Sequence, residues 1–137
     1  MARTAAIRMR GRADSLRITD MASSAPLSIR ERIKGIQRGL RDGALTPDMA
    51  RESLVALTAL LGNVNDEQRE ADADYKLVLL GCLTAEKKAN RARIKAETSP
   101  QYARAREAKD TATLVIEMMR SCRAYLRSLD EEMRLAR

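Results

Sequence analysis

The sequence contains no histidine, phenylalanine or tryptophan, and its aromatic residues are three tyrosines. Without histidine, the chain lacks the most common general base and the most common ligand of transition metals. Compact cores draw much of their buried area from aromatic side chains, so 2% aromatic content favours slender helix-on-helix packing. The sequence therefore predicts a protein that is not an enzyme and has no metal or other cofactor.

Long apolar runs are also missing. The most apolar stretch, Leu77–Leu83, is much shorter than the roughly 18 residues that a membrane-spanning helix needs. No membrane partner is therefore expected. The two cysteines, Cys82 and Cys122, lie on apolar stripes and are predicted to be buried, unpaired thiols of a reducing compartment.

Positive charge is in excess. The chain has 26 basic and 19 acidic residues, a net charge of +7 and a pI near 9.9. Such a balance favours acidic partners, either nucleic acid or an acidic protein surface.

Two apolar stripes with alternating spacings of three and four residues lie on either side of Ser99-Pro100. The first runs from Ala71 to Ala96 and the second from Ala105 to Ala136. Stripes of this kind belong to long helices that each present one face to a partner. Residues 63–137 are therefore predicted to form a long antiparallel helical hairpin, coiled-coil-like, that reverses at Ser99-Pro100 and places Ala89 opposite Ala108.

Two shorter helices are predicted ahead of the hairpin, within residues 28–62. Ser28 and Glu31 form a capping-box pattern at the start of the first, and Gly43 ends it. Thr46-Pro47-Asp48 begins the second, and Gly62-Asn63 ends it. Residues 1–27 have no sustained period and are expected to form a flexible basic arm. The predicted class is all-α.

Basic residues gather in two predicted regions. The hairpin tip carries Lys87, Lys88, Arg91, Arg93, Lys95, Arg104, Arg106 and Lys109. The arm and the first helix carry Arg8, Arg10, Arg12, Arg30, Lys34, Arg38 and Arg41. These positions are the candidate contacts to phosphates or to an acidic protein partner; the alternative is a solvated helix surface and a basic tail with no partner.

The apolar belt at Leu77–Leu83 and Leu114–Met119 exceeds what two helices can cover. We expect the two short helices to cover it, with a possible homo-oligomer forming through the same segments.

From Gln68 to Arg137 the pattern resembles small all-helical accessory proteins of tailed bacteriophages. The resemblance is carried by Tyr75, by Thr84-Ala-Glu-Lys-Lys88 and Ser99-Pro-Gln-Tyr-Ala103, and by the closing Leu129-Asp-Glu-Glu-Met-Arg134. The resemblance implies a phage origin and a non-enzymatic accessory role. Together with the excess of positive charge, this predicts a phage or mobile-element protein that acts on nucleic acid or on nucleic-acid-handling machinery. The alternative is a virion structural or assembly component, and the expected location is the host cytoplasm or the virion.

Overall fold

The computed structural model describes residues 27–137, which form four helices and no strand. The helices are α2 (Ile29–Asp42), α3 (Pro47–Ala85), α4 (Ala89–Glu97) and α5 (Pro100–Leu135). The predicted all-α class is confirmed. The predicted arm, apart from Leu27, lies outside the described residues.

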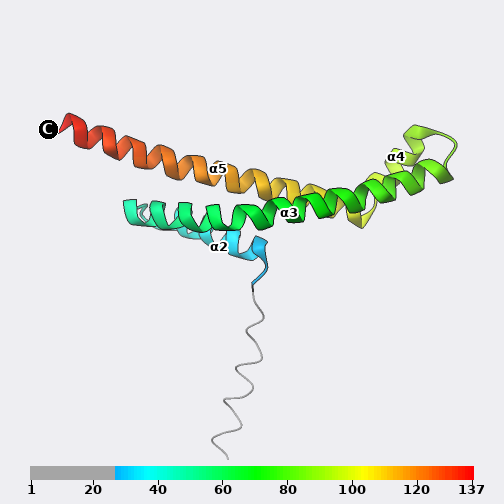
Figure 1. Ribbon diagram of the computed structural model, residues 1–137, viewed down its shortest axis with the longest axis horizontal. Coiled ribbons are helices and arrows are strands. Elements are labelled where there is room, and N and C mark those ends of the chain that lie inside the picture. Colours follow the sequence, from blue (N-terminus) through cyan, green and yellow to red (C-terminus); the bar gives the residue numbers. More distant parts are fainter. Residues whose placement is uncertain (1–26) are drawn as a thin grey trace, which may run out of the picture.

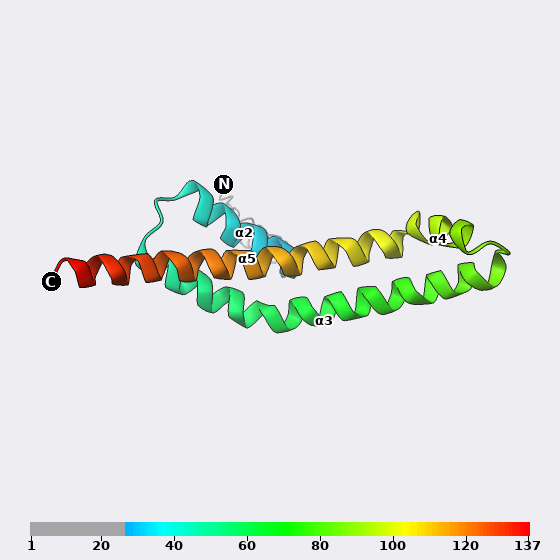
Figure 2. The same ribbon diagram turned by 90° about the horizontal axis from the view of Figure 1, so that it is seen from above.

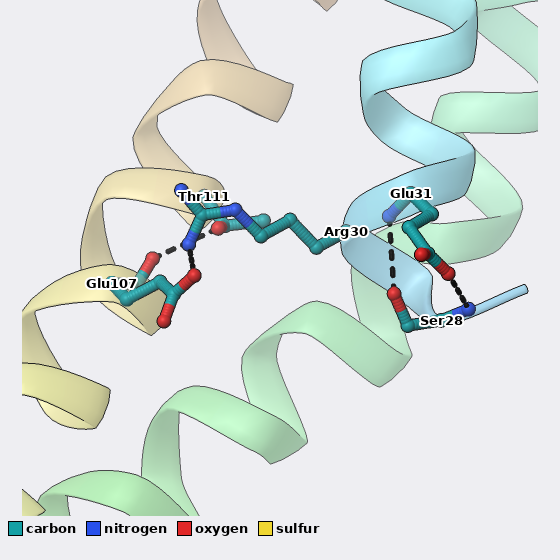
Figure 3. Close-up of polar contacts among 5 residues, drawn as sticks. All are labelled: Ser28, Arg30, Glu31, Glu107 and Thr111. Atoms are coloured by element: carbon teal, nitrogen blue, oxygen red, sulfur yellow. Dashed lines mark hydrogen bonds and ion pairs between the residues drawn. The ribbon is translucent and has the colours of Figure 1, made fainter.

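The starts of three helices follow the local chemistry of the sequence. The Ser28 hydroxyl accepts a hydrogen bond from the Glu31 amide, and the Glu31 carboxylate accepts one from the Ser28 amide, so α2 begins with a complete capping box (Figure 3). At the starts of α3 and α5, the hydroxyls of Thr46 and Ser99 accept hydrogen bonds from the amides of Met49 and Tyr102, and each cap is followed by proline at the first helical position.

The predicted helix end at Gly62-Asn63 is wrong, because α3 is one helix of 39 residues that runs through this position from Pro47 to Ala85. A glycine inside a helix costs about 1 kcal/mol relative to alanine. Leu57 before the glycine and Val64 after it are both buried in one core, and this packing outweighs that cost. The predicted boundary between residues 62 and 63 therefore falls inside one helix.

The chain reverses at Glu86–Lys88, and the predicted reversal at Ser99-Pro100 is wrong. Glu86 and Lys88 both have extended backbone angles, with α3 ending before them and α4 beginning after them. The break at Ser99-Pro100 instead separates α4 from α5 within the returning chain (Figure 2). No glycine or proline marks the true reversal, so the spacing of the residues gives no sign of it.

Helices α3 and α5 lie side by side and run in opposite directions (Figures 1 and 2). Tyr75 packs on Tyr102 with ring centroids 5.1 Å apart, and Asp74 Oδ2 lies 2.7 Å from Arg104 Nη1. Opposed residues thus have numbers that add to about 177 or 178. The predicted pairing of Ala89 with Ala108 is wrong by about twenty positions, since it assumed the later reversal.

The main core lies where α2 crosses α3 and α5. Its buried members are Ile33 of α2, Leu57 and Val64 of α3, and Ala112, Val115, Met118 and Met119 of α5. The segment Leu114–Met119 is therefore largely covered within the chain, as expected, and most of it is not available to a second copy. Leu77–Leu83 is not covered by α2, because the observed register places it beyond that helix.

The C-terminal end of α5 extends past the start of α3, at the opposite end of the molecule from α4 (Figures 1 and 2). The Tyr125 hydroxyl donates a 2.9 Å hydrogen bond to the Leu45 carbonyl, which fastens the α2–α3 connection to α5. Within residues 27–137, no helix combines the length and apolarity that crossing a membrane requires.

The register makes a prediction about two alanines. Ala71 is fully buried, whereas Ala89 is exposed. Replacing Ala71 by leucine overpacks the contact between α3 and α5 and lowers the free energy of unfolding by about 1–3 kcal/mol. Ala89→Leu, the matched control, changes it by less than about 0.5 kcal/mol. Urea denaturation of both variants measures this, and a larger loss for Ala89→Leu would contradict the observed register.

The capping box of α2 makes a prediction about pH. Hydrogen bonds from the Ser28 backbone and side chain lower the pKa of Glu31 from its ordinary value of 4.5, with a further lowering by Lys34. A carboxylate with a lowered pKa stabilises the folded helix at neutral pH, and that stabilisation is lost as the pH falls through the lowered value. The start of α2 therefore loosens on acidification, which NMR shifts of the Ser28 amide report. Glu31→Gln, which keeps an acceptor but does not titrate, removes this dependence.

Candidate functional site

The short helix α4 presents most of its surface to solvent. Ala92 and Ala96 are fully buried, while every other residue of the helix is exposed. Two small side chains on one face hold α4 close to α3, which leaves its long side chains pointing outward. Even the apolar Ile94 is 65% exposed. Helix α4 therefore presents charged side chains to solvent at one end of the molecule.

The charged side chains of α4 and of the two residues before it are mostly basic. We call Lys87, Lys88, Arg91, Arg93 and Lys95 the α4 basic surface; all five are exposed. Within residues 27–137, only Lys95 among them forms an ion pair, with Nζ 3.6 Å from Glu86 Oε1. The other four have no carboxylate partner in the described part of the chain. A cluster of such cations attracts anions from solution.

Two of the three tyrosines lie beside this surface. Tyr75 of α3 packs on Tyr102 of α5 with the rings tilted by 54°, and the Arg106 guanidinium lies 5.9 Å from the Tyr102 centroid. Loss of solvent around Tyr75 raises the pKa of its phenol; the negative charge of Glu97 adds to this, while Arg93 opposes it. Of the described basic residues, Arg106 is the one that lies over the Tyr102 ring.

The tyrosine pair could not be found by sequence reasoning. The predicted register placed Tyr75 far from Tyr102, opposite Cys122. The shortage of aromatic residues makes the pair notable, but the spacing of the tyrosines gives no sign that they meet.

The remaining predicted residues of the tip differ in their surroundings. Arg104 is bound to acidic side chains of α3, with Nη1 2.7 Å from Asp74 Oδ2 and Nη2 3.9 Å from Glu70 Oε2. It joins α3 to α5 and its charge is compensated. Lys109, farther along α5, is exposed and has no ion-pair partner among the described residues.

The basic residues of α2 form a separate surface, because α2 and α4 lie apart along the long axis of the molecule (Figure 1). Arg30 reaches across to α5 and forms an ion pair with Glu107 (Figure 3). Arg41 pairs with the adjacent Asp42 at 2.9 Å. Lys34 and Arg38 are exposed. The structure does not join this group to the α4 basic surface, and Arg8, Arg10 and Arg12 lie outside the described residues.

The candidates for covalent or metal chemistry are few. Cys82 and Cys122 are both unpaired, and Cys122 is buried. Residues 27–137 bring no three cysteine or acidic side chains together in a way that would hold a metal ion.

The difference in burial between the cysteines makes a prediction. Burial raises the pKa of the Cys122 thiol above its ordinary value of 9.0, so little thiolate forms at neutral pH, and the 2% exposed side chain is hard to reach. In the folded protein, we expect Cys82 to react with a thiol reagent at least tenfold faster than Cys122. Mass spectrometry of partly alkylated protein measures the ratio. Equal rates in the folded state, with unfolded protein as control, would contradict the burial of Cys122.

The geometry thus defines one concentrated site, an exposed basic surface next to a tyrosine pair at the α4 end of a slender helical body. No protein-family model, curated protein sequence or solved structure matches the chain.

Proposed function

We propose that this protein is a non-enzymatic nucleic-acid-binding protein that uses the α4 basic surface at the end of a long helical hairpin. One observation carries the proposal. Lys87, Lys88, Arg91 and Arg93 are exposed within seven consecutive residues, and the described part of the chain supplies no carboxylate to any of them. Unpaired cations on a projecting surface match the phosphate backbone, which supplies most of the affinity in sequence-tolerant binding.

The expected binding mode follows from the residue types at the site. Lysine and arginine bind phosphates without reading sequence, and α4 is a single short helix of nine residues. The half-buried Tyr75–Tyr102 pair, with Arg106 over the Tyr102 ring, lies where α3 meets the start of α5 and adds a second surface against which a sugar or base can pack. We therefore expect weak sequence preference and strong dependence on salt.

The proposed setting is a phage or other mobile element, acting in the host cytoplasm on nucleic acid or on the machinery that handles it. This part rests on the resemblance of residues 68–137 to phage accessory proteins.

One observation favours the alternative, a virion structural or assembly component. The stripe of α5 continues past the start of α3, where Met133 and Leu135 are 57% and 89% exposed. An apolar helix end that no residue of 27–137 covers suits packing against a neighbouring subunit. In that case the α4 basic surface would contact an acidic protein.

The salt dependence of binding tests the proposal. For double-stranded DNA, the slope of log K against log salt is about −0.9 per phosphate contact. Changing Lys87, Lys88, Arg91 and Arg93 to alanine removes four unpaired cations and should reduce the magnitude of the slope by about two to four. Fluorescence anisotropy with a labelled duplex of arbitrary sequence, at several salt concentrations, measures it.

The matched control removes cations that already have partners. Arg51, Arg69 and Arg120 are exposed and pair with carboxylates of their own helices at 3.2, 3.5 and 2.7 Å. Their replacement by alanine should change the slope by less than one. If the wild-type protein fails to bind DNA or RNA at low salt, the proposal is wrong and the α4 basic surface is a docking site for an acidic protein.

A further inference from the structure

Helix α4 carries one large apolar side chain on its outward side. Ile94 is 65% exposed. It lies two residues, or about 200° of helical rotation, from Ala92 and from Ala96, the two buried residues of α4. Because those two alanines hold α4 against α3, Ile94 lies on the opposite side of α4 and points away from α3.

An isoleucine at this position contributes nothing to the packing of the helix. A single exposed apolar residue is ordinary on a protein surface. Ile94, however, is the one large apolar side chain on a helix whose other exposed residues, apart from Ala89, are charged or polar. A β-branched residue also has a lower helix propensity than the lysines and arginines around it. The side chain of Ile94 is therefore available to a partner.

Cations of the α4 basic surface lie on both sides of Ile94. At about 100° of rotation per residue, Arg91 is about 60° from Ile94 around the helix axis in one direction, and Arg93 is about 100° from it in the other. Both arginines are exposed, and neither has a carboxylate partner within residues 27–137. Asn90, one turn before Ile94, is exposed as well. An apolar side chain between two cations matches a groove of duplex DNA, where the base edges lie between two phosphate strands.

The type of side chain at the outward position distinguishes the two grooves. A helix that reads the major groove presents hydrogen-bonding side chains to the base edges, and isoleucine can neither donate nor accept a hydrogen bond. In the minor groove, an isoleucine, leucine or methionine can enter between two base pairs, which partly unstacks them and bends the duplex. Arginine and asparagine side chains beside such a residue contact the phosphates and the base edges. The outward position of Ile94 therefore favours the minor groove.

We propose that Ile94 enters the minor groove of duplex DNA between two base pairs and bends the duplex, with Arg91 and Arg93 on the phosphates at either side. This inference rests on the proposed nucleic-acid binding and narrows its substrate to duplex DNA that bends easily. Pyrimidine–purine steps such as TA unstack more readily than other steps. The protein should therefore bind a duplex with a central TA step at least about threefold more tightly than one with a central AT step, which has the same composition. Ile94→Ala should remove this preference.

Fluorescence resonance energy transfer between dyes at the two ends of a duplex of about 20 base pairs tests the proposal, because bending brings the ends together. With the full-length wild type at saturation, energy transfer should rise on the duplex with the central TA step. Ile94→Ala favours helix and leaves every cation in place, so it should lose more than about half of this rise while the salt slope of binding changes by less than about one. Ile94→Leu keeps a large apolar side chain and should retain the rise.

Val55→Ala is the matched control and should change neither the bending nor the salt slope. Val55 is 70% exposed on α3, about 45 Å before Ala85 at about 1.5 Å per residue. If the wild type binds with the expected salt dependence but does not bend the duplex, or binds both duplexes equally, or if Ile94→Ala bends it as the wild type does, the role of Ile94 is overturned and the proposed function stands. A wild type that binds no duplex at low salt overturns both, and Ile94 then belongs to a docking site for an acidic protein.

Discussion

Burial of the inward stripe of α5 against α3 is the contact on which the other elements depend. Val115 is fully buried in the core that also holds Leu57 and Val64 of α3. The same core takes Ile33, the one fully buried residue of α2. Because α2 is short and contains Gly35 and Gly39, its helical form relies on this docking. The long continuous α3 is likewise held across Gly62 by side chains that face α5.

The two ends of the molecule differ because the core occupies one part of its length. Near α2, three helices share apolar side chains and the ion pair between Arg30 and Glu107 crosses between elements. Toward α4 the contact narrows to small residues and one tyrosine pair. A narrow end has little interior, so its long side chains are exposed. This explains why the cations there are unpaired within the described residues and why the leucines on the outside of α3 are left in solvent.

Two kinds of exposed side chain lie near the α4 end. The α4 basic surface offers cations to an anionic partner, and Leu77 and Leu80 are exposed on the outside of α3. Lys87 and Lys88 lie where the two meet.

The sequence by itself determined the helical class, the caps at Ser28, Thr46 and Ser99, and most of the residues that face inward. Caps are local hydrogen bonds, and an apolar stripe needs only the period of the helix, so both can be derived from neighbouring residues. It also identified the cations now seen on α4. The register was decided by tertiary structure alone. The reversal at Glu86–Lys88 has no glycine or proline. The register that follows from it packs Val115 of α5 into one core with Leu57 and Val64 and packs Tyr102 on Tyr75. These side chains are larger than the alanines that the predicted register would have paired, and burial of apolar area stabilises a fold. This register brings Tyr75 against Tyr102, pairs Arg104 with acidic side chains of α3, and leaves Leu77 and Leu80 exposed. The spacing of residues along the sequence predicts none of these three results.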